Sequence, residues 1–536
     1  MAINVAALDE RGRRALQHLV PSPAALVSVG RKDDEAAGGG KPLPKYAALT
    51  GTQIGVLPGI AVDDVPIVFD RARAAGAEWA HTSFAYRKKL MHRFAGLVIH
   101  ERDALLDLVQ WENGKNRASA FEELYDVASN AIYYANNAHA MLKPRRTVGA
   151  VPLLTSTRIY HHPKGVVAVI SPWNYPLTLA ISDALAAIMA GNAIVMKPDS
   201  QTPYTALACK ALLEAAGFPR ELVQVIVGSG AVLGEPMINE ADFVMFTGSS
   251  ATGAGIAQKA GSRLVGVSAE LGGKNPLIVR ADAPMPRAVR GVLKACFASS
   301  GQLCISIERI FVHTDIWDRF VPAFARAVQE MRVEAGYSWA ADMGPLIGKS
   351  QFDKVTAHVA DAVAKGATVL AGGKPIPEAG EFGYAPTVLT DVTPEMDLFA
   401  QETFGPVVSI YRVNSDAEAL RRANATEYGL NGAIWSADLK TAQQMATQLK
   451  TGSVNINDGY AAAWGSLKAP SGGMGISGIG RRHGVEGIVK YTEPQAVATQ
   501  RLMHIGAPGK LGPLNITEEK WERLLSRYLK VFKYFA

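Results

Sequence analysis

The chain has 536 residues, more than one hydrophobic core supports, so we expect two or three domains. Hydrophobic residues make up 48% of it and charged residues 19%, which is typical of a folded globular protein rather than a disordered one. The net charge of +6 is small for this length, and no basic stripe with interleaved aromatic residues occurs, which argues against a nucleic-acid partner. No apolar run reaches membrane-spanning length, and the charged N-terminus does not resemble a signal peptide, so we expect a cytoplasmic protein.

Along the chain, local patterns indicate how it is organised. Residues 1–40 run into the polar, glycine-rich stretch DDEAAGGGKP, and we expect this N-terminal extension to lie outside the main core. Helical periodicity dominates from Val62 to Leu142. Beyond it, short β-branched runs such as GVVAVI and NAIVM alternate with apolar helices. This alternation is typical of an α/β protein with a parallel sheet, whose ligands bind beyond the carboxyl ends of the strands.

Several of these strands end in turns suited to phosphate. The stretch GSGAVLG places Gly230 in a turn that resembles a dinucleotide fingerprint, although its glycine spacing differs from G-x-G-x-x-G. In FVMFTGSSATG, the residues Thr247, Gly248 and Ser249 form the turn between a strand and a helix. The amides of a helix N-terminus favour a pyrophosphate, and an ordinary N-cap is the alternative. Lys197 ends another strand, where it could meet a ribose or phosphate or simply be solvated. Together the turns favour dinucleotide binding.

Three residue types suited to acyl chemistry stand out. Cys209 and Cys296 lie on apolar helical patterns and are expected to be packing thiols, whereas Cys304 follows a Gly-Gln-Leu turn in SSGQLCISIERI. Three scattered thiols form neither a disulfide framework nor a zinc site, so we expect no metal. Glu270, at the end of an apolar run, is a general base or a buried structural carboxylate. Asn174, in SPWNYPLTL, is an oxyanion-hole donor or a turn residue.

Six motifs in order and spacing resemble the aldehyde dehydrogenase superfamily: SPWNYPL, FTGSSATG, AELGGKNP, GQLCISIERI, QETFGPVVSIY and GSVNIN. The resemblance covers roughly Lys41 to Val497. It implies an α/β fold with a parallel-sheet cofactor domain, an α/β catalytic domain and a β oligomerisation hairpin. The expected divisions are an N-terminal extension at 1–40, the cofactor-binding domain at 41–144 and 165–272, the catalytic domain at 273–484, the oligomerisation segment at 145–164 and 485–505, and a basic amphipathic tail at 506–536.

The resemblance also implies a mechanism. Cys304 is then the nucleophile that attacks the aldehyde carbon, and the Asn174 side chain and the Cys304 backbone N–H hold the alkoxide. After hydride leaves, Glu270 activates water to hydrolyse the thioester and release a carboxylic acid. An acyl transfer to coenzyme A and a non-catalytic binding relative are the alternatives. Retention of Glu270 argues against the first, and retention of all three side chains argues against the second.

The cofactor that the resemblance implies is NADP, with NAD possible. Ser200 stands three residues after Lys197, where relatives that prefer NAD often carry a Glu that would repel the 2′-phosphate of NADP. Glu402 is expected to bind the nicotinamide ribose, and Phe404 to pack near the ring. The full expected set is Trp173, Lys197, Ser200, Gly230, Thr247, Gly248, Ser249, Leu271, Glu402 and Phe404.

The substrate is less strongly indicated. The motifs resemble most the actinobacterial-type branch labelled succinate-semialdehyde dehydrogenase [NADP(+)], so succinate semialdehyde is the first expectation. The arginines that hold its distal carboxylate in well-understood members are replaced by Ser182 and Ala298. A broad enzyme for aliphatic or aromatic aldehydes is the alternative. In either case the expected pocket residues are Tyr175, Leu303, Ile305 and Trp464. A further departure is Arg482, at a position where many relatives have Glu.

The ends of the expected domains suggest partners. TSTRIYHHPKG and residues near 485–497 resemble the segments through which subunits of the family pair, so we expect a homodimer or homotetramer. The tail NITEEKWERLLSRYLKVFKYFA places apolar residues at helical spacing with basic residues around them. It could dock on a subunit, or lie peripherally on an anionic membrane.

Overall fold

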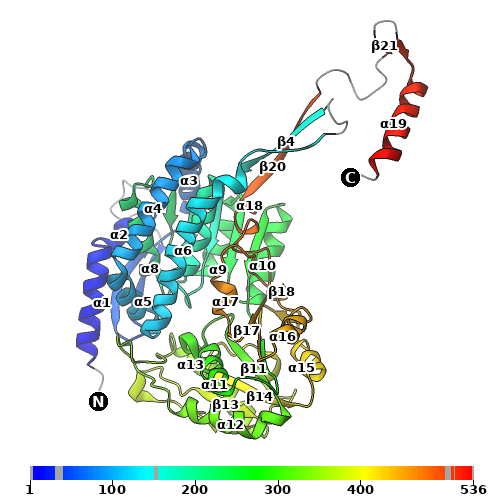
Figure 1. The fold of residues 1–536 in the computed structure, drawn as a ribbon. Helices are drawn as coiled ribbons and strands as arrows, with labels where there is room; N and C mark the ends of the chain where they lie inside the picture. Colours follow the sequence, from blue (N-terminus) through cyan, green and yellow to red (C-terminus); the bar gives the residue numbers. More distant parts are fainter. Residues whose placement is uncertain (1–3, 30–39, 150–154, 501–508, 512–513, 534–536) are drawn as a thin grey trace. The chain divides into compact units, whose positions relative to one another are not determined.

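The computed structural model describes residues 4–29, 40–149, 155–500, 509–511 and 514–533 (Figure 1). The chain forms two compact units. The first comprises Met1–Ala138 and Pro163–Tyr491 and contains both large sheets, and the second comprises His139–His162 and Thr492–Ala536. The expected division of the first unit into cofactor and catalytic domains stays a prediction.

A six-stranded sheet in the first unit carries the phosphate-type turns. Its order is β19-β9-β8-β5-β6-β7, parallel except for the pairing of β19 with β9. All five residues of β5, β6 and β8 are buried, which is why these strands read as continuous β-branched and apolar runs. The strands are β5 (Val166–Ile170), β6 (Ala193–Lys197), β7 (Val223–Val225), β8 (Phe243–Thr247), β9 (Gly266–Glu270) and β19 (Gly478–Ile479).

The register of this sheet brings the expected site residues to one edge. Ile170, the last residue of β5, lies opposite both Lys197 and Phe246, and Thr247 lies opposite Glu270. Parallel strands therefore end together, and the turns that follow them meet at the same edge.

The seven-stranded sheet forms the second large layer of the first unit. Its order is β12-β13-β14-β11-β10-β16-β17, and all pairs but β12 with β13 are parallel. Two apolar clusters pack against it, one containing Phe297, Phe320 and Phe324. Its strands are β10 (Asn275–Val279), β11 (Ile307–His313), β12 (Thr368–Ala371), β13 (Thr387–Thr390), β14 (Val407–Val413), β16 (Asn431–Trp435) and β17 (Ser453–Ile456). Parallel sheets with covering helices confirm the expected α/β class.

Helices of the first unit connect and cover these strands. Those that precede or cover the six-stranded sheet are α1 (Val5–Leu19), α2 (Pro23–Leu26), α3 (Val65–Ala80), α4 (Phe84–His100), α5 (Arg102–Asn113), α6 (Arg117–Leu142), α7 (Thr178–Ala190), α8 (Pro203–Ala216), α9 (Gly230–Glu240) and α10 (Ser250–Ser262). Those that follow are α11 (Met285–Phe297), α12 (Thr314–Gln329), α13 (Lys349–Ala364), α14 (Asp397–Ala400), α15 (Asp416–Ala423), α16 (Leu439–Ala446), α17 (Ala461–Trp464) and α18 (Glu486–Val489). Short pairings add β1 (Gly40–Tyr46) with β2 (Gln53–Gly59) and β15 (Tyr428–Gly429) with β18 (Met474–Gly475).

The N-terminal helix corrects one expectation, because residues 4–29 do not lie outside the core. Helix α1 packs on α5, and Leu16 and Leu19 are buried. Asp9 accepts hydrogen bonds from Trp111 Nε1 at 2.8 Å and Thr50 Oγ1 at 2.7 Å. Helix α1 is amphipathic, and its buried carboxylate is hydrogen-bonded. Packing the helix against the core therefore costs little free energy. The sequence signal was diluted by the linker that follows, which lies outside the described residues.

The second unit contains the expected pairing segment and the tail. Its three-stranded sheet has the order β20-β4-β3, from Thr492–Gln500, Thr155–Pro163 and Arg145–Val148. β21 (Gly509–Leu511) pairs with β22 (Leu514–Ile516), and the tail forms the expected helix, α19 (Glu518–Phe532). Leu524 and Leu529 on α19 are 54% and 61% exposed. Homo-oligomer formation through the strands and membrane contact through α19 stay predictions.

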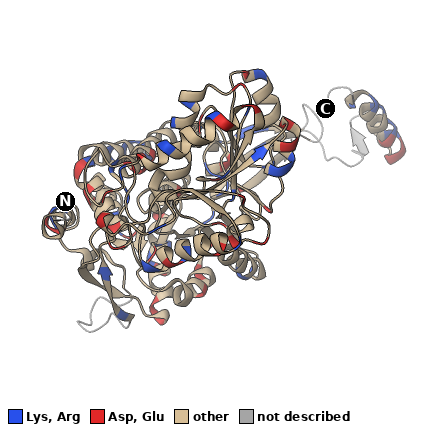
Figure 2. Cartoon of the chain, turned by 90° about the horizontal axis from the view of Figure 1, so that it is seen from below, with Lys and Arg blue, Asp and Glu red and all other residues tan. Residues whose placement is uncertain are grey.

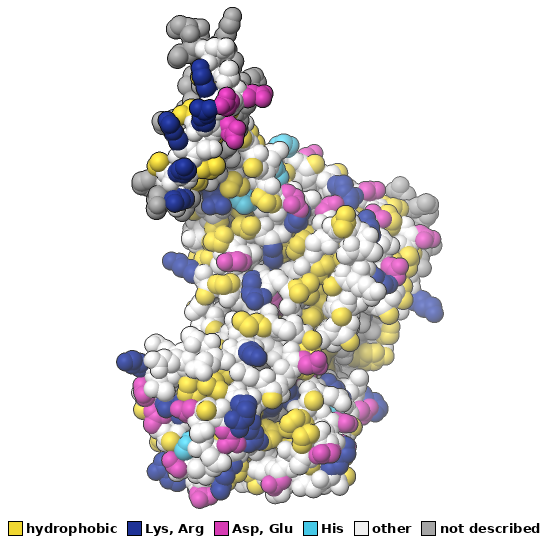
Figure 3. All heavy atoms as spheres, turned by 90° about the vertical axis from the view of Figure 1, so that its right-hand side faces the viewer, with side chains coloured by type: hydrophobic (Ala, Val, Ile, Leu, Met, Phe, Trp, Pro, Cys, Tyr) yellow, Lys and Arg dark blue, Asp and Glu magenta, His cyan; other side chains and the backbone are white. Residues whose placement is uncertain are grey.

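The surface mixes charges of both signs. Lys and Arg are interspersed with Asp and Glu along the helices (Figure 2). In the space-filling view, hydrophobic side chains are scattered among charged ones over the face that is seen (Figure 3). Within the described residues, no helix is both long and apolar enough to cross a membrane.

Candidate active site

A buried ion pair fixes the turn that carries Asn174. Lys115 Nζ donates to Glu123 Oε1 and to the backbone oxygen of Asn174, each at 2.6 Å, and neither charged side chain is exposed. Glu123 in turn accepts from the backbone N–H groups of Leu177 at 2.7 Å and Thr178 at 3.1 Å. With its charge paired and its oxygens satisfied, the pair can be buried, and it holds the turn after β5 in one conformation.

The segment before Cys304 is equally constrained. Ser299, Ser300 and Gly301 have φ values of 50°, 58° and 68°, all in the left-handed region. Gly301 lies so close to the backbone of Gly405 that a Cβ there would collide with it. For Ser299 and Ser300 this conformation is costly and persists only where the surroundings impose it, as at functional sites, whereas Gly301 adopts it readily. They turn the chain between α11 and β11, so that Cys304 lies at the amino ends of β10 and β11, where its backbone oxygen accepts from Asn275 Nδ2 at 2.7 Å.

The residue Cys304 is partly exposed and lines a cavity of about 360 Å³. Burial raises the pKa of this thiol to about 12, and the nearby Arg482 guanidinium opposes the rise. Cys209 and Cys296 are buried in α8 and α11, as packing thiols would be. Cys304 is thus the one cysteine of the three that a small molecule in the cavity can reach.

Glu270 lies at the end of β9 and is 5% exposed. Its Oε1 has no hydrogen-bond partner among the described residues, and a Cβ at Gly472 would stand 2.9 Å from that oxygen. Burial raises the pKa of Glu270 to about 7, against the opposing charges of Arg482 and Lys490. A buried carboxyl with a free oxygen and a pKa near neutrality has the properties of a general base.

Below the cavity Arg482 is held by two side chains. Its Nε and Nη2 lie 2.9 and 2.8 Å from Asp183 Oδ2, and Nη2 donates to Thr247 Oγ1 at 2.5 Å. Lys490 Nζ is 3.6 Å from the other Asp183 oxygen. Burial raises the pKa of Asp183, but the two cations outweigh it and the pKa is lowered overall. The sequence indicated that Arg482 was unusual, but Asp183 and Lys490 were not anticipated.

The cavity brings the expected pocket residues together. Tyr175, Leu303, Ile305 and Trp464 all line it beside Cys304, and their contact with a substrate stays a prediction. Its walls are mainly apolar and aromatic, and the full lining is Phe121, Glu122, Tyr125, Asp126, Ser129, Tyr175, Thr178, Leu179, Lys294, Leu303, Cys304, Ile305, Tyr460, Ala461, Trp464, Gly465, Leu467 and Arg482.

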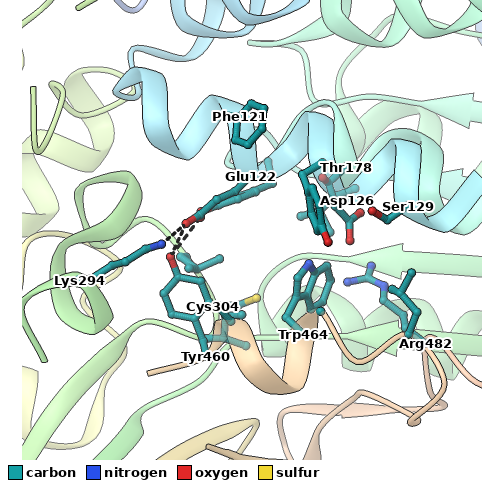
Figure 4. A pocket seen from close by; sticks show the side chains of 18 residues that line it. Phe121, Glu122, Asp126, Ser129, Thr178, Lys294, Cys304, Tyr460, Trp464 and Arg482 are labelled. Atoms are coloured by element: carbon teal, nitrogen blue, oxygen red, sulfur yellow. Dashed lines mark hydrogen bonds and ion pairs between the residues drawn. The ribbon is translucent and has the colours of Figure 1, made fainter. Parts of the chain in front are cut away.

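A polar cluster at this cavity was missed in the sequence. Glu122 accepts from Tyr460 OH at 3.1 Å and pairs with Lys294 Nζ at 2.9 Å, as the dashed lines of Figure 4 show. Asp126 lies one helical turn further along α6 and accepts from Ser182 Oγ at 2.7 Å. The available signal was the spacing of four residues, which puts these two carboxylates on one face of α6. Ser182 and Ala298 stand at the two positions where a substrate-binding arginine was expected to be replaced. Ala298 packs in the apolar cluster of the cavity.

At the edge of the six-stranded sheet, Lys197 is 4% exposed and its Nζ donates to the Pro198 oxygen at 3.1 Å. Burial lowers the pKa of this lysine, opposed by Asp199. Gly230, the first residue of α9, lies close to the end of the Lys197 side chain. Ser249 is the N-cap of α10, where its oxygen accepts from Thr252 N at 3.3 Å. These residues form one edge with two helix N-termini and a buried cation.

The other residues that are expected to bind the cofactor make contacts in several places. Glu402 Oε1 accepts from Gly273 N at 2.8 Å, and burial raises the pKa of Glu402 to about 7. The Phe404 and Trp173 rings meet edge to face with centroids 5.5 Å apart. Thr247 is the last residue of β8 and Gly248 follows it, and Leu271 is buried just beyond β9.

Ser200 stands apart from the cavity of Cys304. It lines a different hollow, where its backbone oxygen accepts from Lys45 Nζ at 2.6 Å. Within the described part of the chain, no group of three or more His, Cys, Asp or Glu side chains is placed to hold a metal ion.

The structure thus holds a reachable thiol, a buried amide and a carboxylate with an unpartnered oxygen near the edge of a parallel sheet. The family model described as "Aldehyde dehydrogenase family" matches residues 35–497. The chain belongs to the aldehyde dehydrogenase family. It is an oxidoreductase of this class, and the resemblance of its motifs is confirmed.

Similar proteins extend over nearly the whole chain. A protein of Mycolicibacterium smegmatis named "Putative succinate-semialdehyde dehydrogenase [NADP(+)]" is 48% identical over 516 residues, which are 95% of this chain and 98% of that protein. A Mycobacterium tuberculosis protein with the same name followed by the number 2 is 50% identical over 459 residues, covering 86% and 89% of the two chains. The crystal structure of betaine aldehyde dehydrogenase from Staphylococcus aureus with NAD+ has a TM-score of 0.85 at 30% identity, covering 92% and 97%. The aldehyde dehydrogenase fold is therefore confirmed.

Proposed function

We propose that this protein oxidises succinate semialdehyde to succinate with NADP, using Cys304 as nucleophile. The observation that carries the chemistry is the convergence of three side chains: the Cys304 thiol faces the cavity, Asn174 bonds to the segment just before it, and Glu270 presents an unpartnered oxygen. The substrate is supported by the printed names of the mycobacterial relatives.

In this proposal each side chain has one task. The Cys304 sulfur adds to the aldehyde carbon, and the second N–H of the Asn174 amide and the Cys304 backbone N–H stabilise the oxyanion. Glu270 then takes a proton from the water that hydrolyses the thioester, which its pKa of about 7 suits. Cysteine is suited to the role because a thiolate adds readily and leaves readily.

The sheet edge has the residues that a dinucleotide needs. Lys197 is a buried cation whose Nζ donates to the neighbouring Pro198 carbonyl, and the N-terminus of α9 lies beside it. The N-terminus of α10 follows β8 at the same edge of the sheet. Lys197, Ser200 and Ser249 would hold the adenosine and phosphate groups, and Glu402, Phe404 and Trp173 the nicotinamide half. The bound dinucleotide supplies the oxidant that accepts the hydride. Ser200 in place of a carboxylate favours NADP over NAD.

The distal carboxylate of the substrate requires a cation, since burying an unpaired charge is costly. Two cations line the cavity among the described residues, Lys294 and Arg482. Arg482 is occupied by Asp183, whereas Lys294 is 61% exposed and paired with Glu122 at 2.9 Å. Lys294 is therefore the residue that we propose to meet the substrate carboxylate.

A second candidate, a broad aldehyde dehydrogenase for aliphatic or aromatic aldehydes, is favoured by the walls of the cavity. Five aromatic side chains line it, including Tyr175, Tyr460 and Trp464. Such walls suit a neutral, apolar aldehyde. The homo-oligomer and the cytoplasmic location are further predictions that accompany either candidate.

An aldehyde panel separates the candidates. We would compare kcat/KM for succinate semialdehyde, hexanal and benzaldehyde, each with NADP and with NAD. A lead of about tenfold for succinate semialdehyde, or about 1.4 kcal/mol, supports the first candidate, and a smaller lead supports the second. The Cys304→Ala variant is the control and is expected to show no turnover.

A further inference from the structure

Arg482 occupies the centre of a buried charge cluster below the substrate cavity. Its guanidinium lines the cavity that Cys304 faces, and Asp183 and Thr247 hold it from the other side. Only 7% of its side chain is exposed. Asp183 contacts both Nε and Nη2, so the guanidinium has one orientation rather than several.

The backbone of Arg482 links this cation to Glu270. Arg482 N donates to the oxygen of Ser471 at 2.6 Å, and Ser471 N donates back to Arg482 at 2.8 Å. The next residue, Gly472, is the one that lies against Glu270 Oε1. One residue therefore supports the segment that packs on the carboxylate and also carries the charge beside it.

The positive charge of Arg482 acts on both proposed catalytic groups. Burial raises the pKa of Cys304 to about 12 and that of Glu270 to about 7, and Arg482 opposes both shifts. The groups that act on Glu270 besides Arg482 are Lys490, Arg481 and Asp183.

The charges around the cluster come from several elements. Lys490, just after α18, pairs with Asp183 on α7. Its Nζ also donates to Ser268 Oγ on β9, 3.2 Å away. Burial lowers the pKa of His483 to about 4, so this neighbour adds no charge near neutral pH. Burial raises the pKa of Asp126 on α6 to about 6. The negative charges of Glu402 and Glu270 raise the pKa of Cys304, and the positive charge of Arg482 lowers it.

We infer that Arg482 is the positioning residue that supplies positive charge to both the Cys304 thiolate and the Glu270 carboxylate, and that Asp183 limits how much of this charge they feel. The inference rests on the proposed roles of Cys304 and Glu270.

The test uses the full chain without cofactor, acetylated once with p-nitrophenyl acetate. Intact-mass spectrometry follows the loss of the acetyl group from about pH 5 to 9 in the wild type, R482M, R482K and D183N. Loss of the acetyl group requires ionised Glu270. Removing the cation should raise the pH midpoint of deacetylation in R482M by about one unit, and R482K should stay close to the wild type. Removing the anion should lower the midpoint in D183N, whose amide can still accept from Arg482.

Opposite shifts in R482M and D183N distinguish an electrostatic role from a merely structural one. Slower deacetylation of all three variants with an unchanged midpoint, or shifts of the same sign, would overturn the inference. The R482M variant could fold poorly, because it leaves Asp183 with one cation fewer. The D183N variant then decides the test by itself. If its pH midpoint of deacetylation does not fall, the roles of Asp183 and of the Arg482 charge are refuted.

A second readout follows the thiol itself. Alkylation of Cys304 by iodoacetamide at fixed pH should be about tenfold slower in R482M, because less thiolate is present. The C304A variant tests the proposed function separately from the role of Arg482. If C304A is still acetylated, the proposed function fails; if it is not, but the Arg482 variants behave as wild type, only the inference fails.

Discussion

The side-chain amide of Asn174 donates a hydrogen bond to the backbone oxygen of Gln302, 3.0 Å away, just before Cys304 in the chain. The amide nitrogen carries two hydrogens, so one fixes the side chain and the other is left for a reacting oxygen. The bond ties the turn after β5 to the nucleophile segment. The donor and the thiol are thus placed by the same contact.

Replacing Asn174 with Ala should remove the oxyanion donor and lower kcat by about 10²–10³, with little change in KM. Steady-state kinetics with the best aldehyde of the panel measures this. Asn174→Asp is the matched control: it keeps the size but not the donor, and should be at least as impaired. A loss confined to KM would contradict the assignment.

Replacing Lys115 with Met should unpair Glu123 in the core and lower the free energy of unfolding by about 3–5 kcal/mol. Urea denaturation followed by fluorescence measures it. The control is Lys349→Ala, which breaks an exposed pair with Asp353 at 2.7 Å whose side chains are 77% and 55% exposed. That change should cost less than about 1 kcal/mol. Equal losses in both variants would show that the buried pair has no special role.

Deacylation should depend on pH through Glu270. Because burial raises the pKa of Glu270 to about 7, the basic form is scarce below that value and predominant above it. The rate of thioester hydrolysis should therefore rise with pH through about 7 and then level off. Single-turnover measurements over this range test it, and Glu270→Gln should abolish the pH-dependent part. A rate that falls as pH rises would contradict Glu270 as the base.

Replacing Ser200 with Glu should lower kcat/KM for NADP by about tenfold or more, because a carboxylate would repel the 2′-phosphate. The value for NAD should change much less or improve. Both cofactors are compared on one aldehyde at saturating concentration. Ser200→Ala is the control, since it removes the hydroxyl without adding charge. Equal loss with both cofactors would place Ser200 outside the discrimination.

Replacing Lys294 with Met should lower kcat/KM for succinate semialdehyde by about tenfold and leave hexanal nearly unchanged. Glu122→Gln is the matched variant: it releases Lys294 from its ion pair and should raise the preference for the anionic substrate. The ratio of the two kcat/KM values is the readout. A ratio that neither variant moves would remove Lys294 from substrate selection.

Local sequence patterns were enough to predict several strands, one helix cap and the family of this protein. Continuous apolar runs marked β5, β6 and β8, because a strand buried on both faces needs apolar side chains throughout. The turn residues after them are set by local backbone requirements, so Ser249 could be recognised as an N-cap. The motifs around Cys304 indicated the family, and four expected pocket residues do line one cavity with it.

What the tertiary structure alone decided are the pairings between distant elements. Arg482 and Asp183 are 299 residues apart and meet because α7 and the segment before α18 pack together. Glu122 and Asp126 line the cavity because one face of α6 borders it. Helix α1 packs on α5, where Trp111 donates a hydrogen bond to Asp9. Periodicity tells which face of a helix is buried but not which side chains lie opposite, and a buried charge is stable only when its partner is in place.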